Sequence, residues 1–339
     1  MIYLDYSANT PVDEAVLQRF CEVERNCPGN ANSRHAAGTA AKAAIDAATQ
    51  SIARSLNVQP AEIIYTSGAS DAIKSIARLE RHHGSHIIST PLEHSSVSGS
   101  LTALQEQGYE IDLVDIRQDG TVDLAHLKEL LRPDTILVAV TAVDSELGVV
   151  QPVAEIAEML KACPHCHFHV DATQAVGKLP VSFAGIDTMS LTAHKFYGLN
   201  GIGVLVKRRG LALEPLIHGG ESTTLYRSGT PTVALACSLA LALEKAVTEL
   251  PAREDGLLHD KGAHPRPERP PAHRACPIPQ GAHQQPGHRR AADFKPERTE
   301  REGHRVPAGA GCPGRMRLGQ IGLLVGRPAL PGGVRRQPP

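Results

Sequence analysis

Tryptophan is absent from this sequence of 339 residues, and aromatic residues make up only 3% of it. The core of the protein must therefore consist of aliphatic side chains and alanine. No run of about eighteen apolar residues occurs, which excludes a membrane-spanning helix. The net charge of -1 gives no reason to expect nucleic acid or an anionic membrane as a partner.

The cysteines are few and irregularly spaced. Seven are present, and their spacing does not indicate a disulfide framework, so we expect a reducing compartment. The first residues read MIYLDYSANTP and turn polar at once, without the basic and then apolar pattern of a secretory signal. We therefore expect a cytoplasmic protein.

Two regions of different composition follow each other along the chain. Up to about residue 247, alanine-rich segments alternate with short β-branched runs, whereas more than half of the 25 prolines lie after residue 250. Frequent proline removes backbone donors, and this Arg-, Pro- and Gly-rich composition cannot bury enough apolar surface to fold. We interpret residues 251–339 as a disordered basic tail or as a frameshifted reading of GC-rich DNA, in which only Gln320–Val325 resembles a strand.

The alternation before residue 247 predicts an α/β fold, with a mostly parallel sheet covered by helices on both faces. Ligands of such sheets bind beyond the carboxyl ends of the strands. Helices are expected at Ala37–Leu56, Ala69–Arg81, Ser95–Gln107, Asp123–Leu131 and Pro152–Ala162. Strands are expected at Glu62–Thr66, His86–Ser89, Glu110–Val114, Thr135–Thr141, His167–Asp171, Thr188–Thr192 and Gly203–Lys207.

Polar residues follow two neighbouring strands in the middle of the chain. The first strand ends at Asp171 and is followed by Gln174, and the second delivers Thr192, His194 and Lys195. A lysine can form a Schiff base with pyridoxal 5'-phosphate (PLP), and an acid facing the pyridine nitrogen stabilises the protonated ring. The pattern is typical of a PLP enzyme, although an aspartate at this place can also be an N-cap and a lone lysine is usually solvated.

Two further segments at strand ends contribute candidate residues. Ser70, with Gly68 before it, lies where a strand gives way to a helix, a junction that attracts phosphate but is also an ordinary N-cap. His94 follows another strand. It can stack on a planar cofactor or transfer protons, or it can be a surface histidine before a helix capped by Ser95.

The segment CPHCHFH at residues 163–169 suggests zinc at first sight. No second ligand pair with suitable spacing is evident, and several of these residues lie in an expected loop and strand. His82, His83 and His86 precede another strand, and we interpret them as solvated. We therefore expect no metal.

Together the motifs resemble the class V aminotransferase family of fold-type I PLP enzymes, and within it the NifS/IscS-type cysteine desulfurases. The motifs follow one another in order over residues 2–247, and this makes the resemblance specific. They are YLDYSANTPVD at 3–13, TSGAS at 66–70, EH at 93–94, HVDATQAVGKLP at 169–180, AHKFYG at 193–198 and RSGT at 227–230.

The resemblance implies a role for each matching residue. Lys195 would form the Schiff base and move protons at the substrate Cα, and Asp171 would pair with the pyridine nitrogen. Gln174 would hydrogen-bond the phenolic oxygen of the cofactor, and His94 would stack on its ring as a second catalytic residue. The phosphate would be held by Ser70, Thr192, His194 and, from the second subunit of a homodimer, Thr230. The reaction would convert L-cysteine to L-alanine and pass the sulfur, as an enzyme persulfide, to an acceptor protein.

Three departures from the family pattern limit what is carried over. An asparagine that would contact cofactor and substrate is Ser145 here, and the glycine-rich segment reads GGEST at 219–223. The C-terminal small domain is missing or scrambled. That domain would supply the persulfide-forming cysteine and the arginine that binds the substrate carboxylate, and neither Cys276 nor Cys312 of the tail is assigned such a role.

We accordingly divide the chain into an N-terminal segment that contributes to the active site (1–15), a PLP-binding large domain (16–250) and the tail (251–339). A cysteine desulfurase homologue is the favoured interpretation, with iron–sulfur cluster assembly as one candidate destination of the sulfur. The alternatives are a selenocysteine lyase or other class V PLP aminotransferase, and a non-catalytic remnant of the fold. The missing small domain would have distinguished between these reactions.

Overall fold

The structure is a computed structural model, and it describes residues 2–67, 80–215, 217, 226 and 228–252. The helix expected at Ala69–Arg81 lies outside these residues except for its last two, and so do Ser70 and everything from residue 253 onward, including the strand expected at Gln320–Val325. Within the described part, no helix is long and apolar enough to cross a membrane.

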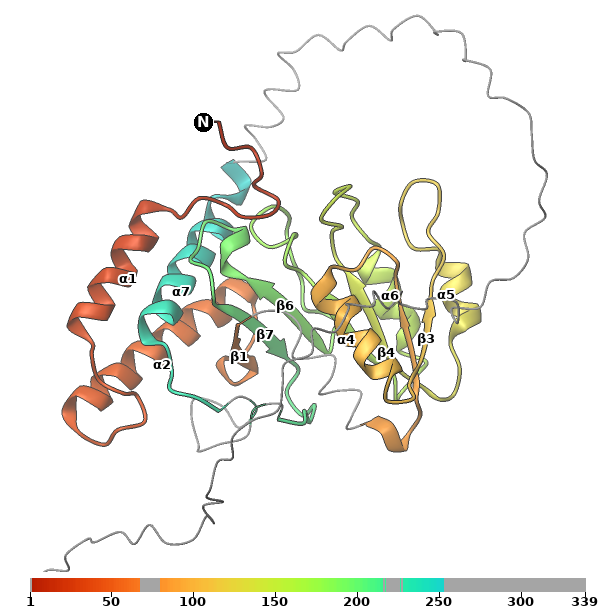
Figure 1. Cartoon of the computed structure of the whole chain (residues 1–339), viewed down its shortest axis with the longest axis horizontal. Coiled ribbons are helices and arrows are strands. Elements are labelled where there is room, and N and C mark those ends of the chain that lie inside the picture. Colours follow the sequence, from red (N-terminus) through yellow and green to blue (C-terminus); the bar gives the residue numbers. More distant parts are fainter. Residues whose placement is uncertain (1, 68–79, 216, 218–225, 227, 253–339) are drawn as a thin grey trace, which may run out of the picture. The chain divides into compact units, whose positions relative to one another are not determined.

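Within the residues that the structure describes, seven strands form one sheet, several strands of which are labelled in Figure 1. Their order is β1-β7-β6-β5-β4-β2-β3, and only β7 runs antiparallel to its neighbours. The expected mostly parallel sheet is therefore confirmed, and the carboxyl ends of β4, β5 and β6 meet at one edge. The strands are β1 (Ile63–Thr66), β2 (His86–Ser89), β3 (Glu110–Leu113), β4 (Thr135–Thr141), β5 (His167–Asp171), β6 (Thr188–Thr192) and β7 (Gly203–Lys207).

The helices are α1 (Glu14–Asn26), α2 (Ala36–Leu56), α4 (Ser95–Gln105), α5 (Leu124–Leu130), α6 (Val153–Leu160) and α7 (Val233–Thr248), with the 3-10 turns η1 (Pro60–Glu62), η2 (Glu80–His82) and η3 (Ala193–Lys195). Four of these helices, α2, α4, α5 and α6, match predicted ones. Helices α1 and α7 are not among the predictions. Helix α7 buries most of its surface, so it lacks the polar stripe by which an amphipathic helix is identified in a sequence.

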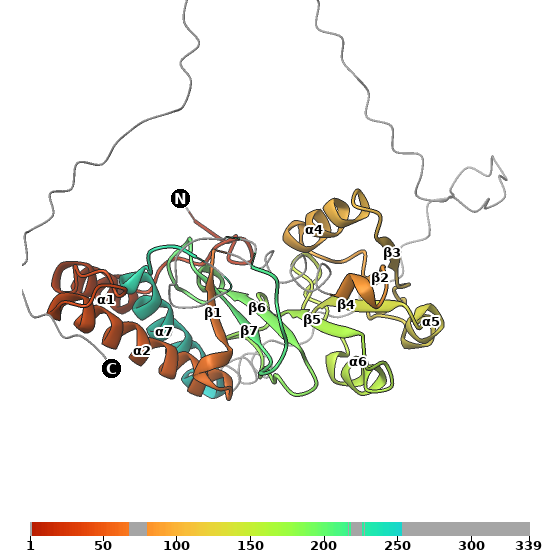
Figure 2. The ribbon, with the colours of Figure 1, turned by 90° about the horizontal axis from the view of Figure 1, so that it is seen from below.

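Two aliphatic clusters fill the two faces of the sheet. Side chains alternate across a strand, and accordingly Ile63 and Val138 belong to the larger cluster, whereas Ile64 and Ala139 belong to the smaller one. Helices α1, α2, α6 and α7 contribute to the larger cluster, and α4 contributes to the smaller one. Figure 2 shows α4 on one side of the sheet and α6 on the other. The expectation of helices on both faces is confirmed.

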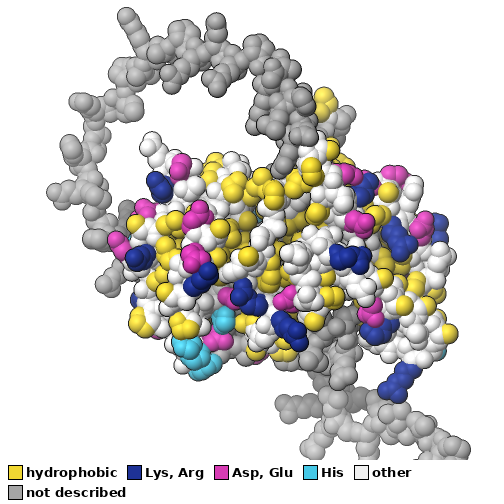
Figure 3. Space-filling model, turned by 180° about the vertical axis from the view of Figure 1, so that it is seen from behind, with side chains coloured by type: hydrophobic (Ala, Val, Ile, Leu, Met, Phe, Trp, Pro, Cys, Tyr) yellow, Lys and Arg dark blue, Asp and Glu magenta, His cyan; other side chains and the backbone are white. Residues whose placement is uncertain are grey.

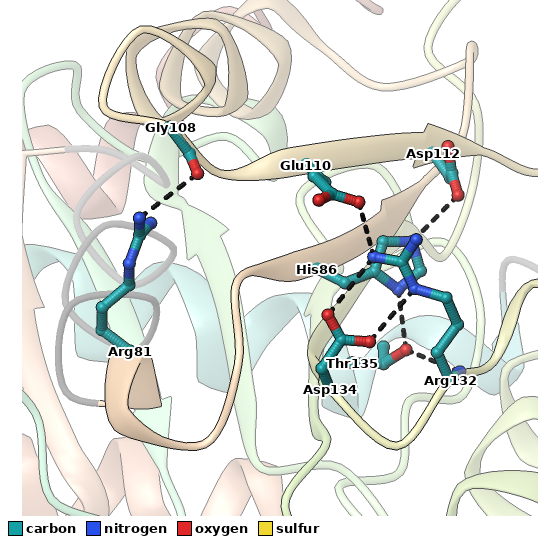
Figure 4. A network of polar contacts seen from close by, with 8 residues as sticks. All are labelled: Arg81, His86, Gly108, Glu110, Asp112, Arg132, Asp134 and Thr135. Carbon is teal, nitrogen blue, oxygen red and sulfur yellow. Dashed lines mark hydrogen bonds and ion pairs between the residues drawn. The ribbon is translucent and has the colours of Figure 1, made fainter.

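A polar network surrounds the amino ends of β2, β3 and β4 (Figure 4). The ring of His86 is fully buried, with Nδ1 at 2.7 Å from Thr135 Oγ1 and Nε2 at 3.0 Å from Asp112 Oδ2. Burial and the charge of Arg132 lower the pKa of His86. The expectation that His86 is solvated is wrong, because this residue is the first of β2 and lies beneath the network.

Asp13 ties the start of α1 to α7. Its Oδ1 accepts from the backbone N–H of Ala15 at 2.9 Å, and its Oδ2 lies 2.6 Å from Lys245 Nζ.

We expect Asp13→Ala to lower the free energy of unfolding by about 1–2 kcal/mol, since it removes a helix cap. The bond from Lys245 lowers the pKa of Asp13 below its usual 3.8. The ionised Asp13 therefore contributes its full stabilisation of the fold above pH 3.8, and this stabilisation is lost as the pH falls through the lowered pKa. Urea denaturation measures the effect. Asp13→Asn keeps the cap acceptor and should lose less, and equal losses in the two variants would contradict the capping role.

Candidate active site

A cavity of about 350 Å³ opens at the carboxyl ends of β4, β5 and β6. It brings together seven residues that were singled out in the sequence, which are His94, Ser145, Asp171, Gln174, Thr192, His194 and Lys195. Ser67, Leu92, Thr141 and Thr173 also line it, together with Ala8 from the N-terminal segment. Ser70 lies outside the described residues, and Thr230 is exposed and is not part of this lining.

Asp171 ends β5 with only 4% of its surface exposed. Its Oδ1 accepts from the backbone N–H of Thr173 at 3.0 Å and from the hydroxyl of Ser190 at 3.3 Å. Behind Ser190 lies the fully buried ring of His169, whose Nδ1 is 2.9 Å from Thr188 Oγ1 and whose Nε2 is 3.5 Å from Ser190 Oγ. This polar row holds the carboxylate from beneath and leaves its other oxygen for a ligand.

Burial lowers the pKa of His169 to about 4, against the opposing charge of Asp171. The ring is therefore neutral at physiological pH and acts in the row through hydrogen bonds. His169 and Ser190 are not among the predicted site residues. The alternation of side chains across β5 and β6 contains the signal, because it places both residues on the face of the sheet that carries Asp171.

Two lysines approach the cavity. Lys195 ends the turn η3 after β6 and donates to the backbone carbonyls of Ser7 and Ala8, the latter at 2.8 Å. Burial lowers its pKa, although Asp5 and Asp171 oppose the shift. The second amine is that of Lys178, which is not among the predicted site residues. Burial and the charge of Lys195 lower the pKa of Lys178 to about 8.

Gln174 links this second lysine to the N-terminal segment. Its Nε2 donates to the carbonyl of Ser7 at 2.8 Å, and its Oε1 accepts from Lys178 Nζ at 2.6 Å. Both ends of the amide are thus bonded within the chain. A cofactor oxygen would have to replace one of these contacts in order to use Gln174.

Two threonine hydroxyls supply the clearest indication of a missing ligand. Among the described residues, Thr66 Oγ1 and Thr192 Oγ1 are buried without a hydrogen-bond partner. Both lie around Gly203, at the strand ends beside the cavity. A buried polar atom without a partner is costly, and a phosphate bound in the cavity would satisfy the hydroxyl of Thr192, which lines it. His194 lies at the same end, where burial and the charges of Lys195 and His94 lower its pKa, so its neutral ring can also donate one hydrogen bond. These residues fit a phosphorylated, planar cofactor.

His94 lines the cavity and caps α4 at once. Its Nδ1 accepts from the backbone N–H of Ser96 at 3.2 Å. Ser95 is the first residue of the helix, so the expectation that Ser95 provides the cap is wrong. The capping bond fixes the imidazole at the rim of the cavity, where its exposed ring is available to stack on a planar ligand.

Glu93 is a buried acid next to this site that is not among the predicted site residues. Its Oε1 accepts from the Thr90 hydroxyl and the Thr141 backbone N–H, both at 2.8 Å. Its Oε2 is buried without a partner in the described part of the chain. Burial raises the pKa of Glu93 to about 8, despite those two bonds, and the charges of Asp171 and Asp144 add to the rise. At neutral pH, Glu93 is therefore protonated in most of the protein molecules.

Solved structures of known proteins share this fold. A NifS-like protein is 35% identical with a TM-score of 0.73, and the match covers 77% of this chain and 74% of that one. A structure titled SspA in complex with cysteine is 31% identical with a TM-score of 0.69, covering 77% and 78%. The expected fold, that of the large domain of fold-type I PLP enzymes, is confirmed.

Curated sequences agree with the structures. Cysteine desulfurase IscS of Glaesserella parasuis is 40% identical over an alignment of 265 residues, and the match covers 74% of this chain and 65% of that protein. A NifS/IcsS protein homolog of Lactobacillus delbrueckii is 38% identical over 256 residues, covering 74% and 66%. The chain thus spans slightly less than two thirds of the length of these relatives. The model of the family described as aminotransferase class-V matches residues 2–255, and the chain therefore belongs to the aminotransferase class-V family.

Proposed function

We propose that this protein is a PLP-dependent cysteine desulfurase, which takes the sulfur from L-cysteine and leaves L-alanine. One observation carries the proposal: the amine of Lys195 and the carboxylate of Asp171 line the same cavity, beside a buried hydroxyl of Thr192 that has no partner in the described residues. The names of the relatives support the substrate, since several are cysteine desulfurases and one related structure contains cysteine.

The residues divide the work of holding the cofactor. Asp171 would face the pyridine nitrogen, because Ser190 and Thr173 already fix one of its oxygens. The phosphate would be bound by the hydroxyl of Thr192 and the ring of His194, with Ser70 as a further donor. When bound, PLP supplies an electron sink for the substrate Cα. His94 would cover the ring from the rim.

Lys195 would be the base. Burial favours its neutral amine, which can attach to the cofactor and can accept the proton that leaves the substrate Cα. The same nitrogen would return a proton to the product. Ser145 lines the cavity and would contact the substrate through its hydroxyl, with a shorter reach than the asparagine that the family pattern has at this position.

Sulfur transfer needs a thiol that becomes a persulfide: the thiolate attacks the sulfur of cysteine, and the electrons of the broken carbon–sulfur bond stay with the product alanine. Among the described residues no cysteine lines the cavity. Burial raises the pKa of the Cys166 and Cys237 thiols, which disfavours their thiolates. The acceptor would be a thiol from elsewhere in the chain or from a partner protein.

The lack of a cysteine in the cavity lining of the described residues favours a second function, that of a PLP-binding protein that does not transfer sulfur. L-Cysteine added with dithiothreitol as the acceptor thiol separates the two. Release of alanine and sulfide in equal amounts supports the desulfurase, whereas cofactor binding without alanine supports the second function.

We also propose that the protein is a cytoplasmic homodimer. Ile2 and Leu4 are 86% and 84% exposed beside the N-terminal segment that contacts Lys195, and a second subunit would cover such side chains. Thr230 is exposed and would then reach the phosphate of the other subunit. Light scattering measures the mass of the particle.

Residues 251–339 are proposed to be a frameshifted tail, which resequencing of the gene tests.

The position of the bound cofactor tests the central proposal. The full chain is incubated with PLP, reduced with borohydride and digested, and mass spectrometry then locates the pyridoxyl group. We expect it on Lys195. Modification of Lys178, or equal modification of exposed lysines such as Lys42, would contradict the assignment, because it would show reaction outside the cavity.

A further inference from the structure

Two histidine-containing segments meet at the amino ends of β2 and β5. One is the turn η2 with the residue after it, and the other is the loop between α6 and β5. From the sequence no metal is expected, because the segment at 163–169 has no second pair of ligands nearby in the chain. The fold places η2 beside that segment. Figure 3 shows histidine side chains gathered at one end of this face, with acidic side chains next to them.

The distances show how tightly the two segments are gathered. One ligand atom each of Glu80, His82 and His83 lies within 4.8 Å of the other two. The rings of His82 and His83 have centroids 3.9 Å apart, and the ring of His83 stacks on that of His165 at 4.1 Å. His167 Nε2 lies 3.2 Å from Glu80 Oε1. Three imidazoles, those of His82, His83 and His167, therefore lie close to the Glu80 carboxylate, and a fourth, that of His165, stacks on His83.

We propose that Glu80, His82 and His83 bind a divalent transition-metal ion, with zinc as the expected occupant. Imidazole nitrogen and carboxylate oxygen are ligands that zinc accepts at about 2.0–2.2 Å. Two such ligands of a tetrahedral ion lie roughly 3.4 Å apart, so the three side chains, whose ligand atoms now lie within 4.8 Å of one another, would have to rotate inward on binding. His82 and His83 are exposed, and Glu80 is half-buried. Three protein ligands leave the fourth position to water or to His165.

The surroundings support the site. Ligating carboxylates are usually held by an outer hydrogen bond, and His167 provides one to Glu80 while its other nitrogen faces Asp187 at 3.8 Å.

The metal site is separate from the candidate active site. His167 begins β5 and Asp171 ends it, and four steps of about 3.3 Å place the two ends about 13 Å apart. The metal proposal is therefore independent of the proposed PLP chemistry, and its test uses binding as the readout.

Calorimetric titration of the full chain with zinc chloride tests the proposal. We expect one ion per chain at this site, and at least about a 100-fold loss of affinity in the double variant His82→Ala with His83→Ala, since loss of an outer partner alone costs about 10- to 100-fold. Glu80→Gln, which keeps the shape of the side chain but removes its charge, should weaken binding in the same direction. His126→Ala is the matched control, because this histidine pairs with Asp115 away from the cluster, and it should bind as the unaltered protein does.

Cobalt(II) serves as a spectroscopic probe in the same experiment, since the chain also contains cysteines and further histidines. Nitrogen and oxygen ligands give visible d–d bands without the intense thiolate charge-transfer band, and these bands should vanish in the double variant. Unchanged zinc affinity in both the double variant and Glu80→Gln, a thiolate spectrum, or no binding by the unaltered protein would each overturn the proposal.

Discussion

Lys195→Ala is expected to abolish covalent attachment of PLP, whereas Lys178→Ala should retain it. Both amines are partly buried and both have a lowered pKa, to about 8 for Lys178. The lowered pKa therefore does not distinguish Lys195 from Lys178 as the attachment site, but their positions in the structure do. Lys195 lines the cavity that holds Asp171, whereas Lys178 lies in a neighbouring cavity and donates to Gln174.

The measurement is the visible absorption band of the attached cofactor after removal of free PLP, together with its loss on addition of hydroxylamine. Loss of the band should be complete in Lys195→Ala, because no other amine lines that cavity within the described residues. Lys195→Arg keeps the charge and should also lose the band. A band of full intensity in either Lys195 variant would refute the assignment, and its loss in Lys178→Ala alone would transfer the role to Lys178.

Glu93→Gln is expected to stabilise the protein above about pH 8 and to remove part of its pH dependence. The pKa of Glu93 rises from 4.5 to about 8 on folding. Between these values the unfolded chain is ionised while the native acid keeps its proton, so the free energy of unfolding falls as the pH rises through this window. A glutamine is neutral throughout and accepts the same bonds from Thr90 and Thr141. Because one pKa unit corresponds to about 1.4 kcal/mol, the gain above the window is on the order of a few kcal/mol.

Urea denaturation on both sides of the window measures this effect. The quantity compared is the difference between variant and unaltered protein, because other groups titrate in the same range. Glu155→Gln, which replaces an exposed carboxylate on α6, should leave the pH dependence unchanged. If the stability of Glu93→Gln followed the same pH curve as the unaltered protein, Glu93 would not carry the raised pKa.

The strands could be predicted from the sequence because each is a short apolar run between polar segments. The bounds of β2, β4, β5, β6 and β7 agree with the prediction residue for residue. The cavity residues Asp171, Thr192 and Lys195 could be predicted for the same reason, since strand ends of a parallel sheet meet at one edge. Helix α7 could not, because burial on nearly all sides removes the periodic pattern.

The remaining parts of the site depend on contacts between distant segments. A glutamate side chain is ionised at neutral pH when it is exposed to water, and only the burial of Glu93 beside Asp171 and Asp144 makes it a neutral group. The cluster of Glu80, His82 and His83 with His165 joins segments about 80 residues apart. No local pattern contains such pairings, and they follow only from the order of the strands in the sheet.

The hydrogen bonds from Lys195 to the carbonyls of Ser7 and Ala8 would be lost when the cofactor is attached to Lys195. A nitrogen that is attached to a cofactor has fewer protons to donate, so loading would release the Ala8 carbonyl from its donor and leave the Ser7 carbonyl with Gln174 alone. Thr10 would remain in place, because its hydroxyl and backbone bond to His194 and Tyr197. We therefore expect cofactor loading to make the backbone of the first nine residues more accessible to proteases. Helix α1, which follows this segment, should stay protected.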